Sequence, residues 1–402
     1  MNEGHSTISG QVVIVGGGVA GLEALIALRD LAGDRVTATL VSQDEWFVDR
    51  PVTVAEPFGL RAAARHPLAE IAAELRATFV RGTVASVAGA EHRVSCAGGP
   101  ELAYDTLILA PGARMQSPSA DAIAFGIAGS GQAVKGMLGR LRSGELRSVA
   151  FIAPSLVGWL LPLYELALMT ARELARSNVQ EVGLCLITPE DRPLALFGGQ
   201  ASESLARLLT AAEIEFIGAT QATVRGGQVT LGATGESRAA DCVVTLPLLC
   251  GPGLAGVPAT QPDGFVPVDD YGRVERLADV YAAGDAVDFP IKQGGLAAQQ
   301  ADAVAAHVAA RRGAPIDPAP FRPLLRGMLF TGAQPQFMRA DLPGTDPEIH
   351  AAWYPLWWPP TKIAGRYLAS YLTGRGELEG VGARPEGFVD VDIPLTASTL
   401  PG

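Results

Sequence analysis

Apolar runs and segments of helical periodicity alternate along this chain. Residues 12–15 form a continuous β-branched run, which is typical of a strand buried on both faces. From residue 22 to residue 31 apolar side chains recur at helical spacing, and Gly33 follows as a residue that tolerates the positive φ of a helix end. The pattern predicts a buried strand and an amphipathic helix joined by a short turn.

This alternation continues to residue 311. Strands are predicted at 35–41, 78–80, 83–87, 104–110, 147–152, 182–187, 213–217 and 240–246, and helices at 68–76, 163–174, 202–212 and 296–311. Strands that alternate with helices form parallel sheets with helices on their faces. We predict an α/β fold with two Rossmann-like dinucleotide-binding domains, the second inserted in the first, plus a small C-terminal α+β region.

The predicted domains follow from the positions of these patterns. Residues 1–118 and 251–313 form the discontinuous first domain, and residues 119–250 form the second, NAD-like domain. The stretch 117–131 is rich in Ala, Gly and Ser and suits a crossing between them. Residues 314–402 form a C-terminal interface or capping region.

A glycine-rich turn joins the first strand to its helix, with the spacing Gly16-x-Gly18-x-x-Gly21. Gly16 permits the tight turn, Gly18 lets a pyrophosphate approach the backbone, and Gly21 lets the helix pack closely on the strand. The free N–H groups around Val19 and Ala20 would face the phosphates of the ligand. Its place between a strand and a helix favours dinucleotide binding over a glycine-rich turn without a ligand.

Composition and charge restrict the kinds of molecule that we expect the protein to bind. The chain has 402 residues, 48% of them hydrophobic, a mean hydropathy of +0.22 and a formal net charge of −11. This acidity argues against nucleic acids and anionic membranes as electrostatic partners. No apolar run is long enough to span a bilayer, and the polar first ten residues do not resemble a signal peptide. We expect a cytoplasmic protein and leave peripheral membrane contact open.

Cysteine and histidine spacing predicts no metal site. None of the cysteines (Cys96, Cys185, Cys242 and Cys250) forms a close-spaced pair, and the five histidines are scattered. We interpret the thiols as having no redox role.

The turn of the second nucleotide-fold pattern departs from the first. It reads APSLVG over residues 153–158, so two of the three expected glycines are replaced. Pro154 offers no backbone N–H to a phosphate, and Trp159 adds bulk beside it. Thr188 holds the position after the next strand where an acidic residue often binds ribose. The sequence therefore disfavours NAD(P)H binding without excluding it.

Other positions in the first domain are expected to line the cofactor. Ser42 follows the second strand, and its hydroxyl is a weaker partner for ribose than the usual carboxylate. Arg50 either faces the pyrophosphate or forms a surface salt bridge, and the residues leave both open. We include Pro51 and Val84 among the lining residues.

Three motifs, in their order along the chain, resemble the two-dinucleotide-domain flavoproteins of the pyridine nucleotide-disulfide oxidoreductase superfamily. They are the Gly16–Gly21 turn, the strand end Ala110-Pro111-Gly112, and the stretch VYAAGD at 280–285. They cover about the first three quarters of the chain. The resemblance implies FAD as the cofactor and a fold of the GR2 type.

The resemblance also implies roles for residues near the flavin. Asp285 would hydrogen-bond the ribityl chain, and Gly284 would let the backbone approach the flavin phosphate. The helix that begins at Gly294, Gly295 and Leu296 would point its N-terminus at the flavin pyrimidine, where the reduced ring carries negative charge.

Within the superfamily the chain is most similar to the sulfide:quinone reductase and type II NADH dehydrogenase branch. The likeness lies in Lys292-x-Gly294 and in AQQ at 298–300, where quinone approaches the flavin in that branch. Lys292 and Lys362 are our candidates for stabilising charge near the ring, and Gln299 for contact with the acceptor. No cysteine follows Cys250, so a pair of sulfide-handling cysteines is not apparent.

The C-terminal quarter is rich in aromatic residues and proline. Residues 353–360 hold three of the five tryptophans, and residues 361–372 predict a helix with Thr361 as its N-cap. The region suits a core or dimer interface, a cap over the flavin or a membrane-surface helix, and a homodimer stays open with these.

Three functions remain as hypotheses. The first is an FAD-dependent oxidoreductase that passes electrons to a quinone-like acceptor or a redox protein. The second uses NAD(P)H as the donor, and the third is a flavin-binding protein without turnover, suggested by the absence of an obvious catalytic cysteine or histidine arrangement. We expect the first.

Overall fold

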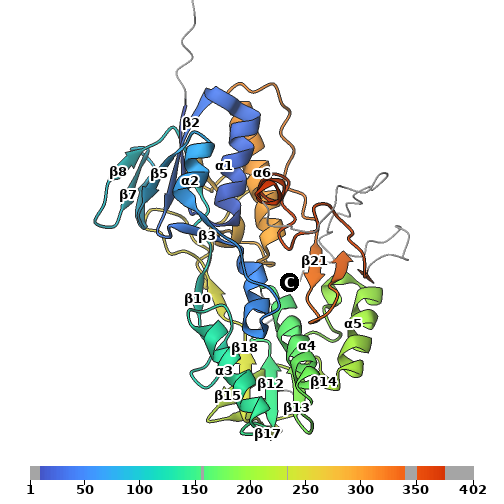
Figure 1. Ribbon diagram of the computed structural model, residues 1–402. Helices are drawn as coiled ribbons and strands as arrows, with labels where there is room; N and C mark the ends of the chain where they lie inside the picture. Colours follow the sequence, from blue (N-terminus) through green and yellow to red (C-terminus); the bar gives the residue numbers. More distant parts are fainter. Residues whose placement is uncertain (1–9, 155–157, 233, 340–350, 376–402) are drawn as a thin grey trace, which may run out of the picture.

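Two five-stranded parallel sheets organise the chain, one above the other in Figure 1. The computed structural model describes residues 10–154, 158–232, 234–339 and 351–375. The upper sheet has the order β20 (Val280–Ala282), β9 (Thr106–Leu109), β1 (Gly10–Val15), β2 (Val36–Ser42) and β5 (Thr78–Arg81). The lower sheet has the order β11 (Ile123–Ala124), β18 (Cys242–Thr245), β12 (Ser148–Ile152), β13 (Gly183–Ile187) and β14 (Ile214–Ile217). The predicted fold class, with two Rossmann-like sheets, is confirmed.

Helices cover these sheets because their apolar faces match the buried strands. Helix α1 (Val19–Ala32) packs on α6 (Gly294–Arg311) and on the upper sheet, in one apolar cluster with β1, β2 and β9. Helix α2 (Leu68–Glu74) lies beside β5. The lower sheet carries α3 (Ser130–Arg142), α4 (Leu161–Arg176) and α5 (Gly199–Ala211). The α1–α6 pair therefore brings together segments that begin about 275 positions apart in the sequence.

Short antiparallel pieces complete the fold. Two three-stranded sheets extend the two layers, namely β6 (Val84–Ala88), β7 (Arg93–Cys96) and β8 (Glu101–Ala103), and β15 (Ala222–Arg225), β16 (Gln228–Leu231) and β17 (Ser237–Ala239). Two two-stranded ribbons are β3 (Trp46–Val48) with β4 (Arg65–Pro67), and β10 (Arg114–Gln116) with β19 (Leu248–Cys250). A 3-10 helix spans Arg50–Phe58. The β10–β19 ribbon pairs the two stretches of chain that run between the large sheets.

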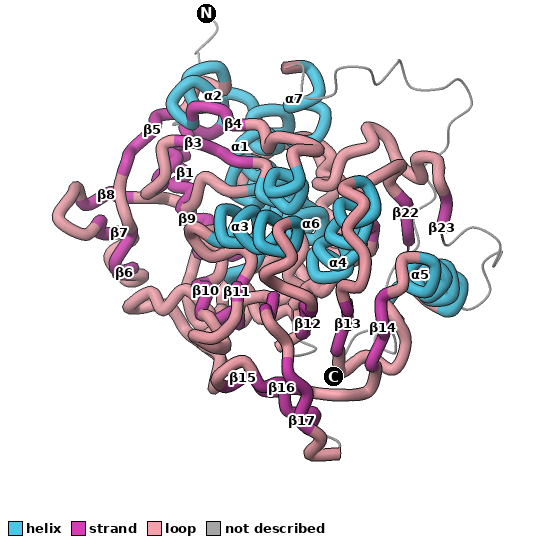
Figure 2. Tube along the Cα trace, turned by 60° about the horizontal axis from the view of Figure 1, so that its bottom comes forward, coloured by secondary structure: helices cyan, strands magenta, loops and turns pink. Residues whose placement is uncertain are grey.

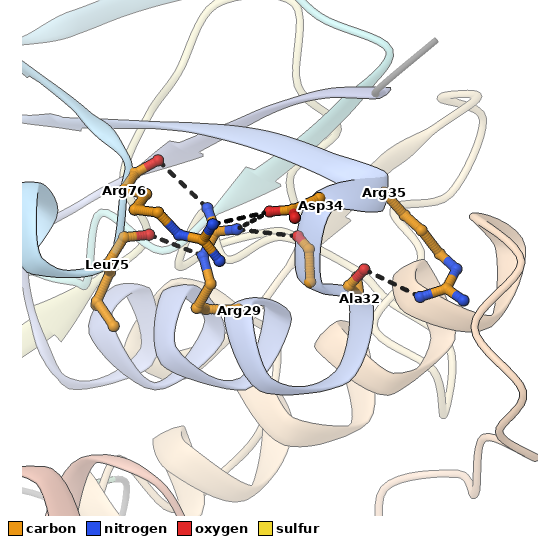
Figure 3. A network of polar contacts seen from close by, with 7 residues as sticks. Arg29, Ala32, Asp34, Arg35, Leu75 and Arg76 are labelled. Carbon is orange, nitrogen blue, oxygen red and sulfur yellow. Dashed lines mark hydrogen bonds and ion pairs between the residues drawn. The ribbon is translucent and has the colours of Figure 1, made fainter. Parts of the chain in front are cut away.

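The end of α1 is fixed by a polar network, which Figure 3 shows from close by. The Arg29 guanidinium donates to the Leu75 carbonyl at 2.8 Å and to the Gly33 carbonyl at 3.0 Å. Asp34 joins Arg29 and Arg76 through ion pairs of 3.5 and 3.1 Å. A basic side chain that satisfies helix-end carbonyls stabilises the helix C-terminus, so this network ties α1 to the end of α2.

The C-terminal region forms a small sheet against the lower half of the molecule. Strands β21 (Arg326–Leu329), β22 (Gln336–Arg339) and β23 (Ala351–Ala352) are antiparallel, and Figure 2 shows β22 and β23 beside α5. Helix α7 (Leu368–Gly374) then packs on α1. The predicted helix at 361–372 is wrong in its first half. The Thr361 hydroxyl donates to the Ile363 carbonyl and the Trp357 indole donates to the Thr361 carbonyl, so these residues hold an irregular segment.

Candidate functional site

The glycine turn after β1 fits closely against the neighbouring strand. Gly16 has a φ of 111°, and a Cβ there would lie 2.0 Å from the Ala110 carbonyl oxygen. A Cβ on Gly21 would lie 1.8 Å from the Gly16 carbonyl oxygen. Gly18 differs, because a Cβ there would meet no protein atom within 4 Å. Gly16 and Gly21 therefore permit close packing, while Gly18 leaves open space beside the N-terminus of α1, where a phosphate can approach.

The other two flavin motifs meet this turn. The Ala110 N–H donates to the Val15 carbonyl at 2.7 Å, so the strand end Ala110–Gly112 lies beside Gly16. The Ala283 N–H donates to the Leu109 carbonyl at 3.0 Å, and the next residue, Gly284, has a φ of 78°. A Cβ on Gly284 would lie 2.9 Å from the Cβ of Ala20. The fold thus brings three distant motifs to one edge of the upper sheet.

Asp285 provides a carboxylate at this junction. It is half-buried, and within the described ranges no protein group hydrogen-bonds its oxygens. Burial raises the pKa of Asp285, while the positive charges of Lys292 and Arg50 lower it. An acceptor left without a protein partner suits the hydroxyls of a bound ligand. The open space at Gly18 and this carboxylate together fit a dinucleotide with a polyol chain.

The N-terminus of α6 is held by glutamines. The Gln293 side chain caps the helix by accepting from the Leu296 N–H at 2.8 Å, and its amide donates to the Arg326 carbonyl at 3.0 Å. The Gln300 side chain accepts from the Gly284 N–H at 2.8 Å. Gly294 and Gly295 begin the helix, and Val19 and Pro51 lie within 4 Å of a Cβ placed on Gly294. The sequence did not single out Gln300 as a site residue, although it belongs to the AQQ segment at 298–300.

Three further residues that we expect to line the cofactor lie at or after the end of β2 in the chain. Ser42 is buried, its hydroxyl accepts from the Asp44 N–H at 3.2 Å, and a Cβ on Gly17 would lie 2.9 Å from its oxygen. Arg50 forms an exposed ion pair with Asp44 at 3.6 Å, which is the surface alternative named above. Val84 is buried at the start of β6, opposite Cys96. Their contact with the cofactor stays a prediction.

Lys292 is buried and directed at backbone and aromatic groups. Its Nζ donates to the Val287 carbonyl and lies 3.6 Å from the centre of the Phe265 ring. Burial lowers the pKa of Lys292 to about 8, although Asp285 and two further aspartates act in the opposite direction. The expected contribution of Lys292 to charge stabilisation near the flavin stays a prediction.

Lys362 lies at a junction of three segments. Its Nζ is 2.6 and 2.7 Å from the two carboxylate oxygens of Glu165 in α4, and it donates to the Pro51 carbonyl at 3.2 Å. The Nζ also lies 4.2 Å from the centre of the Phe330 ring. Burial raises the pKa of Glu165 and lowers that of Lys362, and the attraction within the pair opposes both shifts. The next residue, Ile363, lies 3.5 Å from a Cβ placed on Gly294, so this ion pair stands beside the N-terminus of α6.

Gln299 is occupied by the backbone. Its amide donates to the Gly295 carbonyl at 3.1 Å and to the Leu324 carbonyl at 3.0 Å, and its oxygen accepts from the Leu324 N–H at 2.8 Å. These bonds join α6 to the segment that leads into β21. The expected contact between Gln299 and an acceptor stays a prediction. In the structure the Gln299 side chain connects α6 to the segment before β21 by hydrogen bonds.

The second nucleotide turn is closed at the residues described. Residues 155–157 of the altered turn lie outside the described residues, but Gly158 donates its N–H to the Pro290 carbonyl at 3.2 Å. The Trp159 ring packs edge-on against Phe197 at 5.7 Å. A Cβ on Gly327 in β21 would lie 2.5 Å from the Phe197 ring and 3.2 Å from the Leu161 side chain. The C-terminal sheet therefore packs directly on the start of α4.

An acidic residue does follow β13, at a position that sequence reasoning missed. Glu190 lies two residues beyond Thr188, and its carboxylate accepts from the Tyr164 hydroxyl at 2.6 Å and from the Thr188 hydroxyl at 3.4 Å. Burial raises the pKa of both Glu190 and Tyr164. The carboxylate is therefore engaged with protein hydroxyls rather than available for a ribose.

Three of the four thiols disfavour the reactive thiolate form. All four are unpaired, and burial raises the pKa of Cys96, Cys242 and Cys185, the last to about 11. A raised pKa disfavours the thiolate, which is the nucleophilic form. Within the described residues no group of three or more His, Cys, Asp or Glu side chains has the geometry to hold a metal ion. No helix in the same part of the chain is long and apolar enough to cross a membrane.

Comparisons with known proteins agree with this geometry. The sequence model of the pyridine nucleotide-disulphide oxidoreductase family matches residues 10–311. The sulfide:quinone oxidoreductase structure from Aquifex aeolicus has a TM-score of 0.76 at 22% identity, covering 86% of each chain. A ferredoxin reductase from Rhodopseudomonas palustris gives 0.63 at 16% identity, covering 84% of each chain. The NDH2 structure from Plasmodium falciparum with NADH gives 0.58 at 14% identity, covering 71% of this chain and 65% of that one. No curated protein sequence matches.

Proposed function

Because this chain belongs to the pyridine nucleotide-disulphide oxidoreductase family and is an FAD-dependent oxidoreductase, we propose that it passes electrons from a reductant other than NAD(P)H to a quinone-like acceptor. The observation that carries the proposal is the contrast between its two nucleotide turns. The first has open space at Gly18, whereas the second has its Gly158 N–H bonded to Pro290. A phosphate needs free N–H groups and close backbone approach. The first turn offers open space at Gly18, whereas the described residues of the second turn offer a proline at position 154 and, at Gly158, an N–H that is already bonded.

Packing at the second turn gives further support for excluding NAD(P)H. Trp159 packs on Phe197, and β21 packs on Leu161, at the start of α4. A nicotinamide dinucleotide that needed this space would have to separate these side chains. Interiors packed this closely resist such a change, because the displaced apolar side chains would lose their contacts. Glu190, the acid nearest the usual ribose position, would also lose its bond to Tyr164.

The Lys362–Glu165 pair supports a quinone-like acceptor. Reduction of a quinone to a quinol takes two electrons and two protons, so the acceptor site needs groups that hold protons. When bound, FAD supplies a ring that exchanges two electrons. Lys362 holds protons at Nζ and carries a positive charge that would stabilise the anion formed during reduction, and Glu165 keeps that ammonium in place.

The solved relatives are consistent with this choice. The Aquifex aeolicus protein is a sulfide:quinone oxidoreductase, and the likeness to it extends over 86% of this chain. Sulfide itself is disfavoured as the reductant here, because the three thiols with shifted pKa values are all shifted toward the unreactive form. The sequence also left a redox protein open as the electron acceptor, and the experiment below distinguishes a quinone-like acceptor from a protein acceptor.

Anaerobic spectroscopy of the purified holoprotein tests the proposal. We expect a yellow protein that releases FAD on denaturation and is not bleached by NADH or NADPH within minutes. After reduction by dithionite, a soluble short-chain quinone should restore the oxidised flavin spectrum within seconds. Bleaching by either nicotinamide would establish the NAD(P)H-dependent alternative. Reoxidation by a ferredoxin but not by the quinone would reassign the acceptor to a protein.

A further inference from the structure

Helix α6 begins with a glutamine cap whose side chain has two partners. Gln293 is buried, and its backbone is extended, with a φ of −142°. Its Oε1 accepts from the Leu296 N–H at 2.8 Å, and its Nε2 donates to the Arg326 carbonyl at 3.0 Å. The common N-cap residues Ser, Thr, Asp and Asn all have shorter side chains, and that of Asp is charged. Glutamine therefore adds a second bond, which connects the first turn of α6 to the start of β21 without adding a charge.

Among the described residues, this cap leaves two backbone donors of α6 without a partner. No acceptor in this part of the chain bonds the N–H groups of Gly294 and Gly295, the first two residues of the helix. Gly295 is buried, and buried N–H groups without a partner are rare in folded proteins. A Cβ on Gly295 would lie 3.0 Å from the Gln293 Oε1, so the cap covers one side of this residue. The two N–H groups are available to a ligand group that carries negative charge.

The N-terminus of α6 also lies beside the first glycine turn. A Cβ on Gly294 would lie 3.9 Å from Val19, the first residue of α1, and 3.5 Å from Ile363. The segment that carries Ile363 is itself held on α1, because Glu23 accepts from the Tyr367 N–H at 2.7 Å. The positive ends of two helix dipoles therefore lie close together, and their position is fixed by α1, the C-terminal segment and β21.

We propose that Gln293 is a positioning residue that tunes the reduction potential of the bound FAD. It holds the first turn of α6 so that the Gly294 and Gly295 N–H groups are directed to the part of the ring expected to carry negative charge after reduction. A glutamine does this as a neutral group, whereas a carboxylate at the same place would repel that charge. The proposal depends on FAD binding at the first sheet and not on the identity of the electron donor or acceptor.

The midpoint potential of the holoprotein tests the role of charge, with Gln293→Glu as the main variant. Glutamate keeps an acceptor for the Leu296 N–H and adds a negative charge, so the equilibrium should shift roughly tenfold toward the oxidised flavin. For a two-electron couple this shift corresponds to a potential about 30 mV lower. Measurement at pH 7, 8 and 9 follows the ionisation of the new carboxyl group, which should widen the difference from wild type. Gln228→Glu adds the same charge on exposed β16, which lies away from α6 in Figure 2, and should keep the wild-type potential.

Two neutral variants separate the cap from the charge. Gln293→Leu has no acceptor, so the Leu296 amide of the holoprotein should exchange hydrogen roughly tenfold faster than in wild type. Gln293→Asn can still cap the helix but is too short to keep the bond to Arg326, so its exchange should stay near that of wild type. Its potential should lie between those of wild type and Gln293→Glu. A merely structural role would lower stability without ordering the potentials by charge.

The proposal fails if Gln293→Glu has the wild-type potential at all three pH values, or if Gln293→Asn lies at or below Gln293→Glu. Wild-type exchange of the Leu296 amide in Gln293→Leu would equally overturn it. If Gln293→Glu does not fold, the potential of Gln293→Asn and the exchange in Gln293→Leu decide. If the potentials follow the expected order but the quinone does not reoxidise the flavin, the role of Gln293 stands and the proposed acceptor fails.

Discussion

Individual residues are predictable from sequence where their role is local. The spacing of Gly16, Gly18 and Gly21 follows from one strand–turn–helix unit, and the structure gives each the tight or open surroundings that the spacing predicts. Glu165 and Glu23 are different, because their partners lie 197 and 344 or more positions away. No local pattern marks a buried carboxylate of this kind, so only the folded chain reveals it.

Gly16 and Gly18 predict different outcomes for the same substitution by alanine. Gly16→Ala would place a Cβ 2.0 Å from the Ala110 oxygen at a φ of 111°, so we expect a loss of at least ~1–3 kcal/mol in the free energy of unfolding. Gly18→Ala meets no protein atom, so the apoprotein should unfold within about 0.5 kcal/mol of wild type. The new methyl group would occupy the phosphate space, and FAD should bind roughly tenfold or more weakly, which corresponds to about 1.4 kcal/mol.

Urea unfolding of the apoproteins and flavin fluorescence titration measure the two quantities separately. Wild-type FAD affinity in Gly18→Ala would show that the phosphates lie elsewhere, even if Gly16→Ala proves unstable. Gly59→Ala serves as the control, since it has a positive φ of 64° but open surroundings on a loop outside the predicted site.

At the scale of elements, helices and strands with strong hydrophobic periodicity were predicted from the sequence, and those with weak periodicity were missed. The strand β1 and the helices α1 and α6 were predicted to within a few residues, because each carries a long apolar run or face. Helix α3 was missed since Gly131, Gly136 and Gly139 interrupt its apolar positions. The β21–β22 hairpin was missed as well, because its burial comes from contacts with α4 and α5 rather than from alternation along its own strands.

Two adjacent glutamines in α6 make a matched pair for testing how this helix is connected. Gln299→Ala removes the three hydrogen bonds to Gly295 and Leu324, so stability should fall by about 1–3 kcal/mol while flavin reoxidation by quinone is unchanged. Gln300→Ala frees the Gly284 N–H instead, so it should weaken FAD binding more than it lowers stability. Thermal unfolding measures the stability of each variant, and stopped-flow spectroscopy measures the rate of flavin reoxidation. A slow Gln299→Ala enzyme of normal stability would instead place Gln299 at the acceptor.

At the scale of the whole molecule, the Lys362–Glu165 pair joins parts that the sequence could only treat separately. Glu165 belongs to α4 on the lower sheet, Pro51 to the 3-10 helix beside the upper sheet, and Lys362 to the C-terminal region. The predicted boundaries at 118, 250 and 313 separate these three parts. Their order along the chain does not indicate that one ammonium group contacts all of them, although Lys362 itself could be singled out because the chain has only three lysines.

This position predicts that Lys362 matters for the stability of the entire fold. Lys362→Met would leave Glu165 buried without its counter-charge, at a cost of about 3–5 kcal/mol near neutral pH. Glu165 would then have a still higher pKa, so the cost should shrink as the pH falls and the carboxyl takes up a proton. The double variant Lys362→Met, Glu165→Met removes both charges, and it should be more stable than the single variant.

Arg93→Met, which breaks an exposed pair with Glu101 at 3.1 Å, should change stability by only about 0–1 kcal/mol. Urea titrations at pH 5 and pH 8 measure the stability of the wild type and of the three variants. If Lys362→Met were no less stable than Arg93→Met, the Lys362–Glu165 ion pair would not contribute to holding the three parts together, because a buried carboxylate that loses the ion-pair partner it has among the described residues should destabilise the folded state.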